Sequence, residues 1–295
     1  MTHRIETVPQ SEGAQSQSSP TTRAVKALLQ SALNTFGWQA LRRQGKGYDI
    51  RRKMRLGRNH IKDIRTILGN RVQVIFDVGA NDGQTVRAFL PAFSRASIYS
   101  FEPDPRTFER LAASVRDEPR VRVVNAALGR ETGNATLFRS KLDQTYSLLP
   151  KAEGAEQYVF DAEYLVNAGT VAVRITSIDE FCAENGVEHV DLLKIDTQGY
   201  EVEVLEGARR LLNSGSVSMI YAEVCFVRYY ERQPLFQDVY ELLYDLGYRL
   251  VGIYESGFLT HSYQVGGNAL FIHERLGGLA PAERKVVVGS LRICW

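Results

Sequence analysis

The stretch from Val74 to Gly83 holds the residues best suited to binding chemistry, because two acids and two glycines follow an apolar run. The run predicts a buried strand that ends in a tight turn, and the polar stretch after Gly83 predicts a helix. A second apolar run, 97–101, predicts the neighbouring strand and ends at Glu102. In a doubly wound sheet both turns lie at the carboxyl edge, where ligands bind. A carboxylate there can accept hydrogen bonds from two ribose hydroxyls, so the sequence predicts a nucleoside-containing ligand.

The spacing of the glycines distinguishes between two kinds of nucleoside cofactor. A dinucleotide site needs G-x-G-x-x-G, whose backbone amides meet a pyrophosphate at the start of a helix. Here Gly79 and Gly83 are spaced G-x-x-x-G, with Asp77 two residues ahead. Asp77 and Asp82 would repel a pyrophosphate, whereas a carboxylate attracts the ammonium of an amino-acid tail. The pattern D-x-G-x-x-x-G resembles the first motif of S-adenosylmethionine-dependent methyltransferases.

The rest of the chain supplies the elements of a largely parallel sheet, with alternating strand and helix signals from about residue 61. Seven strands are predicted, at 73–78, 97–101, 120–125, 190–195, 218–224, 249–254 and 268–273. Helices are predicted at 84–90, 105–116, 178–184, 201–212 and 235–246. The last two strands are separated by a loop without a helix signal. The predicted fold class is α/β: a Rossmann-like, seven-stranded, mostly parallel sheet with an antiparallel edge strand.

A second strand–turn–helix signal runs from Asp191 to Glu201 and contains Asp196, Gln198 and Gly199. Three further segments follow the same order: Phe101-Glu102-Pro103, Val124 to Gly129 and Thr176 to Asp179. As an ordered set, these motifs resemble the FkbM-type methyltransferase family over roughly residues 72–273. The resemblance implies an O-methyltransferase that uses S-adenosylmethionine and acts on a saccharide, a glycolipid or a secondary metabolite. The family usually has Glu where this chain has Gln198, so a role as base or metal ligand does not transfer to that position.

The resemblance also implies cofactor-binding residues at the ends of the first four strands: Asp77, Gly79, Asn81, Gly83, Glu102, Asn125, Ala126 and Asp196. The first four would contact the methionine part of the cofactor, and Glu102 would hold the ribose hydroxyls. Asn125 and Ala126 would flank the adenine, although Asn125 is equally suited to capping the end of a strand. Asp196 would lie near the sulfonium and the methyl group.

Methyl transfer to a hydroxyl also requires that the hydroxyl lose its proton. Candidate catalytic groups follow the fourth, fifth and sixth strands: Asp196, Glu223 and His261. His261 has the intrinsic pKa best suited to a base, whereas Glu223 could instead orient substrate or pair with Arg228. No H-x-x-x-H or paired-carboxylate spacing indicates a metal site. The alternatives to a methyltransferase are an NAD(P)-dependent oxidoreductase and a cofactor-binding protein without catalysis.

Aromatic residues near the predicted ligand edge suggest where an acceptor would bind. The segment from Ser140 to Gly169 is too long for a simple connection and contains four aromatic residues, which predicts a lid over the substrate. Tyr229 and Tyr230, beyond the fifth strand, could form a platform for a sugar ring. Ordinary packing beneath a loop is the alternative for each of them.

Composition limits the partners of the chain. A net charge of +2 over 295 residues argues against nucleic acid as a partner, so a small-molecule or saccharide acceptor is expected. The three cysteines are widely spaced and odd in number, which favours the reducing cytoplasm over a disulfide framework. No apolar stretch approaches the roughly 18 residues that a membrane span needs.

Four segments are predicted along the chain: a disordered tail over 1–22, an amphipathic helix and basic segment over 23–58, the methyltransferase domain over 59–275, and a C-terminal extension over 276–295. The helix and basic residues within 25–58 permit two interpretations. They could contact an anionic membrane surface, or the helix could pack on the domain and leave a solvated basic face.

Overall fold

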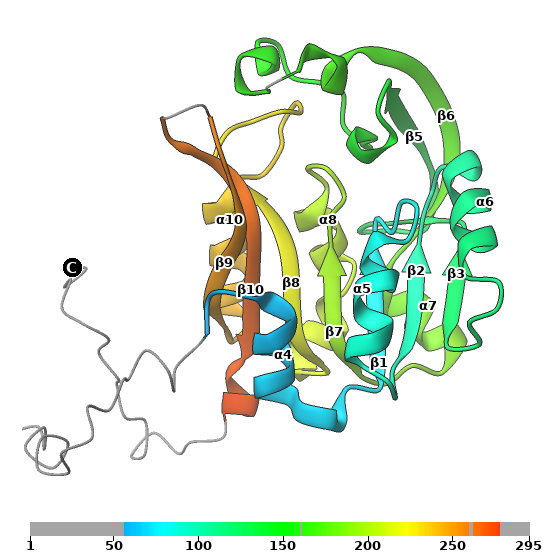
Figure 1. Cartoon of the computed structure of the whole chain (residues 1–295), viewed down its shortest axis with the longest axis vertical. Helices are drawn as coiled ribbons and strands as arrows, with labels where there is room; N and C mark the ends of the chain where they lie inside the picture. The colour runs from blue at the N-terminus through cyan, green and yellow to red at the C-terminus, as the bar shows by residue number, and fades with distance from the viewer. Residues whose placement is uncertain (1–55, 160, 260–261, 278–295) are drawn as a thin grey trace, which may run out of the picture. The chain divides into compact units, whose positions relative to one another are not determined.

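A seven-stranded sheet forms the centre of the computed structural model, which describes residues 56–159, 161–259 and 262–277 (Figure 1). In spatial order its strands are β3 (Val121–Val124), β2 (Ser97–Phe101), β1 (Val74–Val78), β7 (Val190–Ile195), β8 (Val217–Cys225), β10 (Gln264–His273) and β9 (Tyr248–Phe258). The predicted strands are all present, and the predicted fold class is confirmed. One detail differs: the antiparallel strand is β10, which lies one place in from the edge. It does so because β9 and β10 form a hairpin whose second strand pairs with β8.

The order of the strands places a ligand crevice between β1 and β7. From β1 the chain moves outward to β2 and β3, and then continues on the other side of β1 with β7 and β8. The carboxyl ends of strands on either side of such a switch point leave a crevice between their turns. The two acidic turns predicted from the sequence follow β1 and β7, so the topology brings them to the same place.

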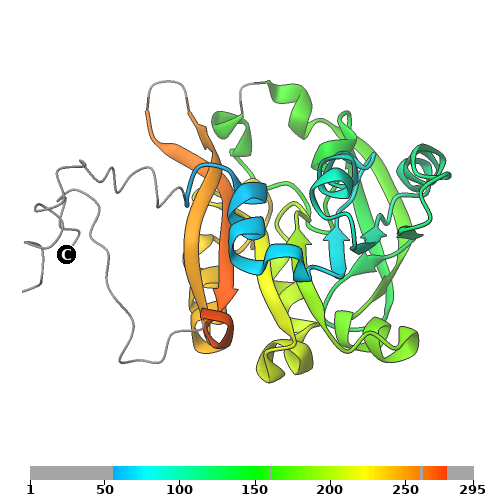
Figure 2. The same ribbon diagram turned by 60° about the horizontal axis from the view of Figure 1, so that its bottom comes forward.

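Helices cover both faces of this sheet (Figures 1 and 2). One layer contains α4 (His60–Leu68), α5 (Gln84–Ala92) and α6 (Pro105–Ser114), and the other contains α7 (Ile178–Asn185), α8 (Glu201–Glu206), α9 (Arg209–Ser214) and α10 (Phe236–Asp245). Because successive strand residues point to opposite faces, Ile75 and Leu192 pack under the first layer, while Phe76 and Leu193 pack under the second.

The single helix predicted over 201–212 is two helices, α8 and α9, which meet at Gly207 and Ala208. Gly207 packs backbone against backbone at this break, since a Cβ there would lie 1.9 Å from the carbonyl oxygen of Gly129. The carbonyl of Gly207 accepts a hydrogen bond from the amide of Asp179 at 2.9 Å. The break therefore joins the start of α7 to the β7–β8 connection.

A second sheet of three strands was not predicted from the sequence. It consists of β4 (Ala127–Leu128), β6 (Asn167–Thr176) and β5 (Gly133–Ser140), in that order. The chain between β5 and β6 carries three short 3₁₀ turns, η2 (Asp143–Thr145), η3 (Ala155–Tyr158) and η4 (Ala162–Leu165), and arches over the carboxyl edge of the main sheet (Figure 1). We call residues 141–166 the insertion.

A buried ion pair ties this second sheet to the main one. Nε of Arg139 on β5 donates to Oδ2 of Asp104 at 2.6 Å, and Asp104 is 1% exposed. Oδ1 of Asp104 also accepts from the backbone amides of Arg106 and Thr107, which caps the start of α6. Asp104 therefore anchors both the helix after β2 and the strand that leads into the insertion.

Several predicted segments lie outside the described residues. These are the tail over 1–22, nearly all of the amphipathic and basic segment over 23–58, and nearly all of the extension over 276–295, so the domain boundaries stay predictions. Among the helices that the structure describes, none combines the length and the apolar character that crossing a membrane requires.

Candidate active site

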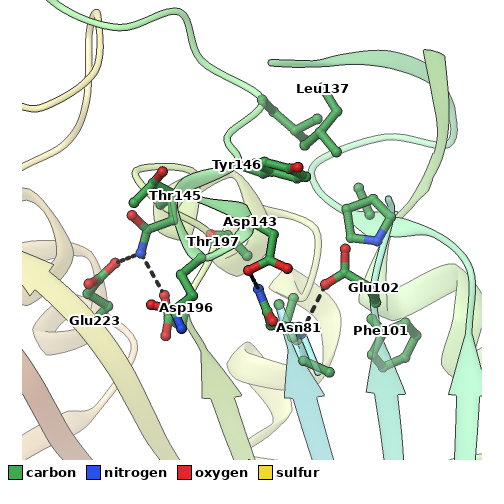
Figure 3. Close-up of a pocket in the computed structure, with 18 of the residues that line it drawn as sticks. Asn81, Phe101, Glu102, Leu137, Asp143, Thr145, Tyr146, Asp196, Thr197 and Glu223 are labelled. Atoms are coloured by element: carbon green, nitrogen blue, oxygen red, sulfur yellow. Dashed lines mark hydrogen bonds between the residues drawn. The ribbon is translucent and has the colours of Figure 1, made fainter. Parts of the chain in front are cut away.

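A cavity of about 500 Å³ lies over the carboxyl ends of β1, β2, β7 and β8 (Figure 3). Its size is typical of a site for a small molecule. The main sheet supplies its floor. Leu137 on β5 and the insertion supply its cover, the insertion through residues 143–146, 148, 159, 164 and 165. Among the residues that the structure describes, no histidine lines this cavity.

The turn after β1 forms the floor and is packed tightly against the end of β7. Gly79 has a φ of +74°, and a Cβ at this position would lie 1.9 Å from the carbonyl oxygen of Asp196. The amides of Gly79 and Ala80 both donate to the carbonyl of Phe101, at 3.1 and 3.0 Å. A glycine is required here both for the backbone conformation and for the close approach.

Glu102 lies at one end of the cavity and is held by backbone amides. Its two carboxylate oxygens accept hydrogen bonds from the amide of Asn81 at 3.0 Å and from the amide of Asp104 at 2.9 Å. Burial raises the pKa of Glu102 to about 7, although these two hydrogen bonds oppose the rise. Each carboxylate oxygen has a second lone pair, so both can still accept a hydrogen bond from a ligand.

A buried ion pair lies beneath the floor. The ammonium of Lys194 is 3.2 Å from Oδ1 of Asp77, 3.8 Å from Oδ2 of Asp196 and 2.9 Å from the carbonyl oxygen of Gly79. Asp77 and Lys194 are register partners on β1 and β7, so their side chains lie next to each other on one face of the sheet. Burial raises the pKa of Asp77, and the ammonium opposes that rise. The ion pair supports both acidic turns from below.

Two carboxylates at the other end of the cavity are joined by one amide. Nε2 of Gln198 donates to Oδ1 of Asp196 at 2.9 Å and to Oε2 of Glu223 at 2.8 Å, as the dashed lines in Figure 3 show. Oε1 of Gln198 accepts from the hydroxyl of Tyr230 at 3.1 Å. Burial holds the pKa of Glu223 well above its ordinary value, and repulsion by Asp196 and Glu201 adds to the effect. We call Asp196 and Glu223 the acid pair.

The insertion is fastened to the sheet at both ends of the cavity. Near Glu102, Nδ2 of Asn81 lies 3.5 Å from Oδ1 of Asp143. Near the acid pair, the hydroxyl of Ser147 donates to the carbonyl of Gln198 at 2.6 Å, and the hydroxyl of Tyr230 lies 3.0 Å from the carbonyl oxygen of Thr145. The segment predicted as a lid therefore covers the cavity.

The structure brings together five of the eight predicted cofactor residues: Gly79, Asn81, Glu102, Ala126 and Asp196 all line the cavity. Asp77, Gly83 and Asn125 do not line it. Asp77 is fully buried two residues before the turn, and Gly83 is the N-cap of α5. The side chain of Asn125 donates to the carbonyls of Glu102 and Pro103, at 2.9 and 3.1 Å. The placement of these three residues supports positioning roles behind the wall rather than contact with a ligand.

Two of the three predicted catalytic residues, Asp196 and Glu223, line the cavity, while His261 lies outside the described residues. Lys194 was not predicted as a site residue, because its relation to Asp77 depends on strand register. In residues 56–277, apart from the gaps at 160 and 260–261, no three His, Cys, Asp or Glu side chains lie together in a way that could hold a metal ion.

Comparison with known proteins identifies the family. A sequence model described as the methyltransferase FkbM domain matches residues 77–250, which is more than half of the chain. The chain therefore belongs to the FkbM methyltransferase family, and it is an S-adenosylmethionine-dependent methyltransferase.

The relatives with curated names are distant. The 2-O-methyltransferase NoeI of Sinorhizobium fredii is 28% identical over 185 residues, which cover 62% of this chain and 75% of that protein. The hexuronic acid methyltransferase AglP of Haloferax volcanii is 28% identical over 151 residues, which cover 51% of this chain and 55% of that protein. A TehB-like methyltransferase structure from Corynebacterium glutamicum has a TM-score of 0.36 at 14% identity, covering 86% of this chain and 100% of that one, a likeness too weak to carry a conclusion.

Proposed function

We propose that the protein transfers the methyl group of S-adenosylmethionine to a hydroxyl of a saccharide, a glycolipid or a related polyhydroxylated metabolite. The observation that carries the proposal is the arrangement of one cavity with Asn81 and Glu102 toward one end and the acid pair toward the other. The name of one relative, a 2-O-methyltransferase, supports an oxygen acceptor, and the name of the other, a hexuronic acid methyltransferase, supports a saccharide.

The residues around the cavity fit the cofactor. Glu102 has lone pairs free for the two ribose hydroxyls, and the turn at Gly79 exposes backbone where a side chain would block approach. Asp196 offers negative charge to the cationic part of the cofactor, and Asn81 and Ala126 also line the cavity. When bound, S-adenosylmethionine supplies an electrophilic methyl group on a positively charged sulfur.

We assign different roles to the two members of the acid pair. Asp196 has a side chain that is 38% exposed and lies beside the Lys194 ammonium, so it is the group that takes the proton from the acceptor hydroxyl. Burial and neighbouring acids raise the pKa of Glu223, which favours its neutral form, so it orients the acceptor through a hydrogen bond. Two carboxylates in different environments can divide acid and base roles in this way.

Methyl transfer from labelled cofactor tests the proposal. The protein is incubated with trideuteromethyl-labelled S-adenosylmethionine and a panel of saccharides, and products are detected by mass spectrometry. We expect label on a sugar hydroxyl, and at least a hundredfold lower rate for Asp196→Asn with unchanged affinity for S-adenosylhomocysteine. Calorimetric binding of NAD in place of S-adenosylhomocysteine would instead support the oxidoreductase alternative.

We also propose that the protein works in the cytoplasm. Cys182 and Cys225, the two cysteines within the described residues, are buried free thiols. Free thiols suit a reducing compartment. Blocking with a thiol reagent under denaturing conditions, after rapid acid quenching of cells, would measure their oxidation state, and a disulfide at either cysteine would count against this location.

A further inference from the structure

We infer that the acceptor is uncharged around the hydroxyl that is methylated: a neutral sugar ring rather than a uronate or a sugar phosphate. This inference rests on the proposed function and narrows it, because it concerns which saccharides the same site can use. It follows from the charged side chains that line the cavity and from the ion pairs that they already form.

The cavity is rich in carboxylates and poor in available cations. Its described lining residues include four carboxylates, Glu102, Asp143, Asp196 and Glu223, and one ammonium, Lys194, with no arginine or histidine. Arg110 balances Asp143 by an ion pair from outside the lining. Among the described residues that line the cavity, Lys194 is the only cation near the acid pair.

Lys194 is poorly placed to serve an anionic acceptor. Its ammonium donates to the carbonyl of Gly79 at 2.9 Å, and its charge faces the carboxylates of Asp77 at 3.2 Å and Asp196 at 3.8 Å. One positive charge is thus shared between two carboxylates, and the side chain of Lys194 is 9% exposed. An acceptor carboxylate or phosphate would therefore gain no counter-charge from it.

The groups that remain at the acid-pair end suit hydroxyls. A sugar hydroxyl can donate to a carboxylate oxygen and accept from a protonated acid or a phenol, and Asp196, Glu223, Tyr229 and Tyr230 line this part of the wall. The carboxylate of a uronate, or the dianionic phosphate of a sugar phosphate, has only acceptor oxygens and would bring negative charge into a cavity that already contains Asp196. Burying a charge without a partner is unfavourable, and repulsion between like charges adds to this penalty.

A competition experiment measures the preference directly. The protein is given labelled S-adenosylmethionine and an equimolar mixture of neutral methyl glycosides, the corresponding uronates and the corresponding sugar 6-phosphates. We expect at least about tenfold more label on the neutral compounds, the ratio that a like charge in a partly solvated site produces. Equal labelling, or preference for the anionic compounds, would overturn the inference while leaving the proposed function intact. If no saccharide is labelled although S-adenosylhomocysteine binds, the proposed function fails and the inference with it.

Two variants that change the charge equally locate the effect. Tyr229→Arg adds a cation to the cavity wall that Tyr229 shares with Glu223, and we expect it to raise the share of label on anionic sugars at least fivefold. Asp143→Asn makes the same change in net charge near Glu102, because it leaves Arg110 without its carboxylate partner. The ratio of label on anionic sugars to label on neutral sugars should then stay within twofold of the native value. An unchanged ratio in a folded Tyr229→Arg protein, or the same shift in both variants, would refute the assignment of the acceptor end. If Tyr229→Arg does not fold, the competition in the unmodified protein still decides the inference.

Discussion

Gln198→Glu is the substitution that tests the acid pair most directly. In the native protein the amide nitrogen of Gln198 donates to Asp196 at 2.9 Å and to Glu223 at 2.8 Å. Glutamate has nearly the same shape and keeps an oxygen that can accept from the Tyr230 hydroxyl. The substitution replaces the amide nitrogen that donates to both members of the acid pair with an oxygen of a third carboxyl group. It therefore changes charge and hydrogen bonding while leaving the packing nearly the same.

The size of the effect follows from these distances. Two unit charges about 2.9 Å apart repel by about 6 kcal/mol at an effective dielectric constant near 20, and the site avoids this cost by taking up a proton. We expect the pKa of the introduced carboxyl to rise by roughly 2 units in the folded protein, equivalent to about 3 kcal/mol. A carboxyl whose folded pKa is raised costs nothing below its unfolded pKa of about 4.3 and progressively more as the pH rises. The variant should therefore approach native stability near pH 4.5 and lose about 3 kcal/mol by pH 8.

Thermal unfolding at several pH values measures this loss. For a chain of this size we expect the Tm of Gln198→Glu to fall below that of the native protein by roughly 6–12 °C at pH 8, and by much less at pH 4.5. Gln144→Glu is the matched control, because Gln144 also lines the cavity but is exposed, so its Tm difference should stay near zero at each pH. A Gln198→Glu protein whose stability follows the native protein over the whole range would refute the assigned role of the bridging amide.

Three further substitutions test the remaining parts of the site. Gly79→Ala should weaken binding of S-adenosylhomocysteine at least a hundredfold by calorimetry, since its Cβ would lie 1.9 Å from the carbonyl oxygen of Asp196; native affinity would contradict the tight turn. Because the pKa of Glu102 is raised to about 7, S-adenosylhomocysteine should bind several-fold more tightly at pH 8 than at pH 6. Glu102→Gln should remove this pH dependence of binding. A variant that kept the native pH profile would show that Glu102 does not hold the ribose hydroxyls. Lys194→Met leaves Asp77 buried without a counter-charge and should cost about 3–5 kcal/mol in denaturant unfolding at pH 7, and a loss below 1 kcal/mol would exclude an ion pair there.

The seven strands of the main sheet could be predicted from the sequence because their signals are local. Val74–Val78 is an apolar, β-branched run that ends at a glycine turn, and Ser97–Phe101 ends at an acid followed by proline. A window of only a few residues is enough to distinguish such apolar runs from the more polar helices between them. The same local logic identified Gly79 and Glu102, which occupy the turns at the ends of two such strands.

The second sheet and the supporting side chains depend on contacts that sequence periodicity does not encode. β5 and β6 are separated by the insertion, and their pairing brings Ala135 opposite Val173 across a gap in sequence. Lys194 becomes a partner of Asp77 only in the register of β1 and β7. Asp77 was predicted to contact the cofactor because it belongs to the D-x-G-x-x-x-G pattern, and Asn125 because it follows the third strand. Neither lines the cavity: Asp77 pairs with Lys194, and Asn125 donates to the carbonyls of Glu102 and Pro103.

Gln198 links the acid pair to the insertion that covers the cavity. It is therefore suited to a positioning role beside Asp196 and need not contact the substrate itself. Its carbonyl accepts from Ser147 of the insertion, its side-chain oxygen accepts from Tyr230, and its nitrogen joins Asp196 to Glu223. Tyr230 in turn lies within hydrogen-bond distance of the carbonyl of Thr145. All these bonds are made by Gln198. A shift of the insertion that breaks the bonds from Ser147 and Tyr230 would therefore also release the Gln198 side chain, whose amide nitrogen holds Asp196 and Glu223 together. Under the role proposed for Asp196, the geometry for proton removal is complete when the insertion covers the cavity, and covering an active site excludes water and strengthens charge interactions.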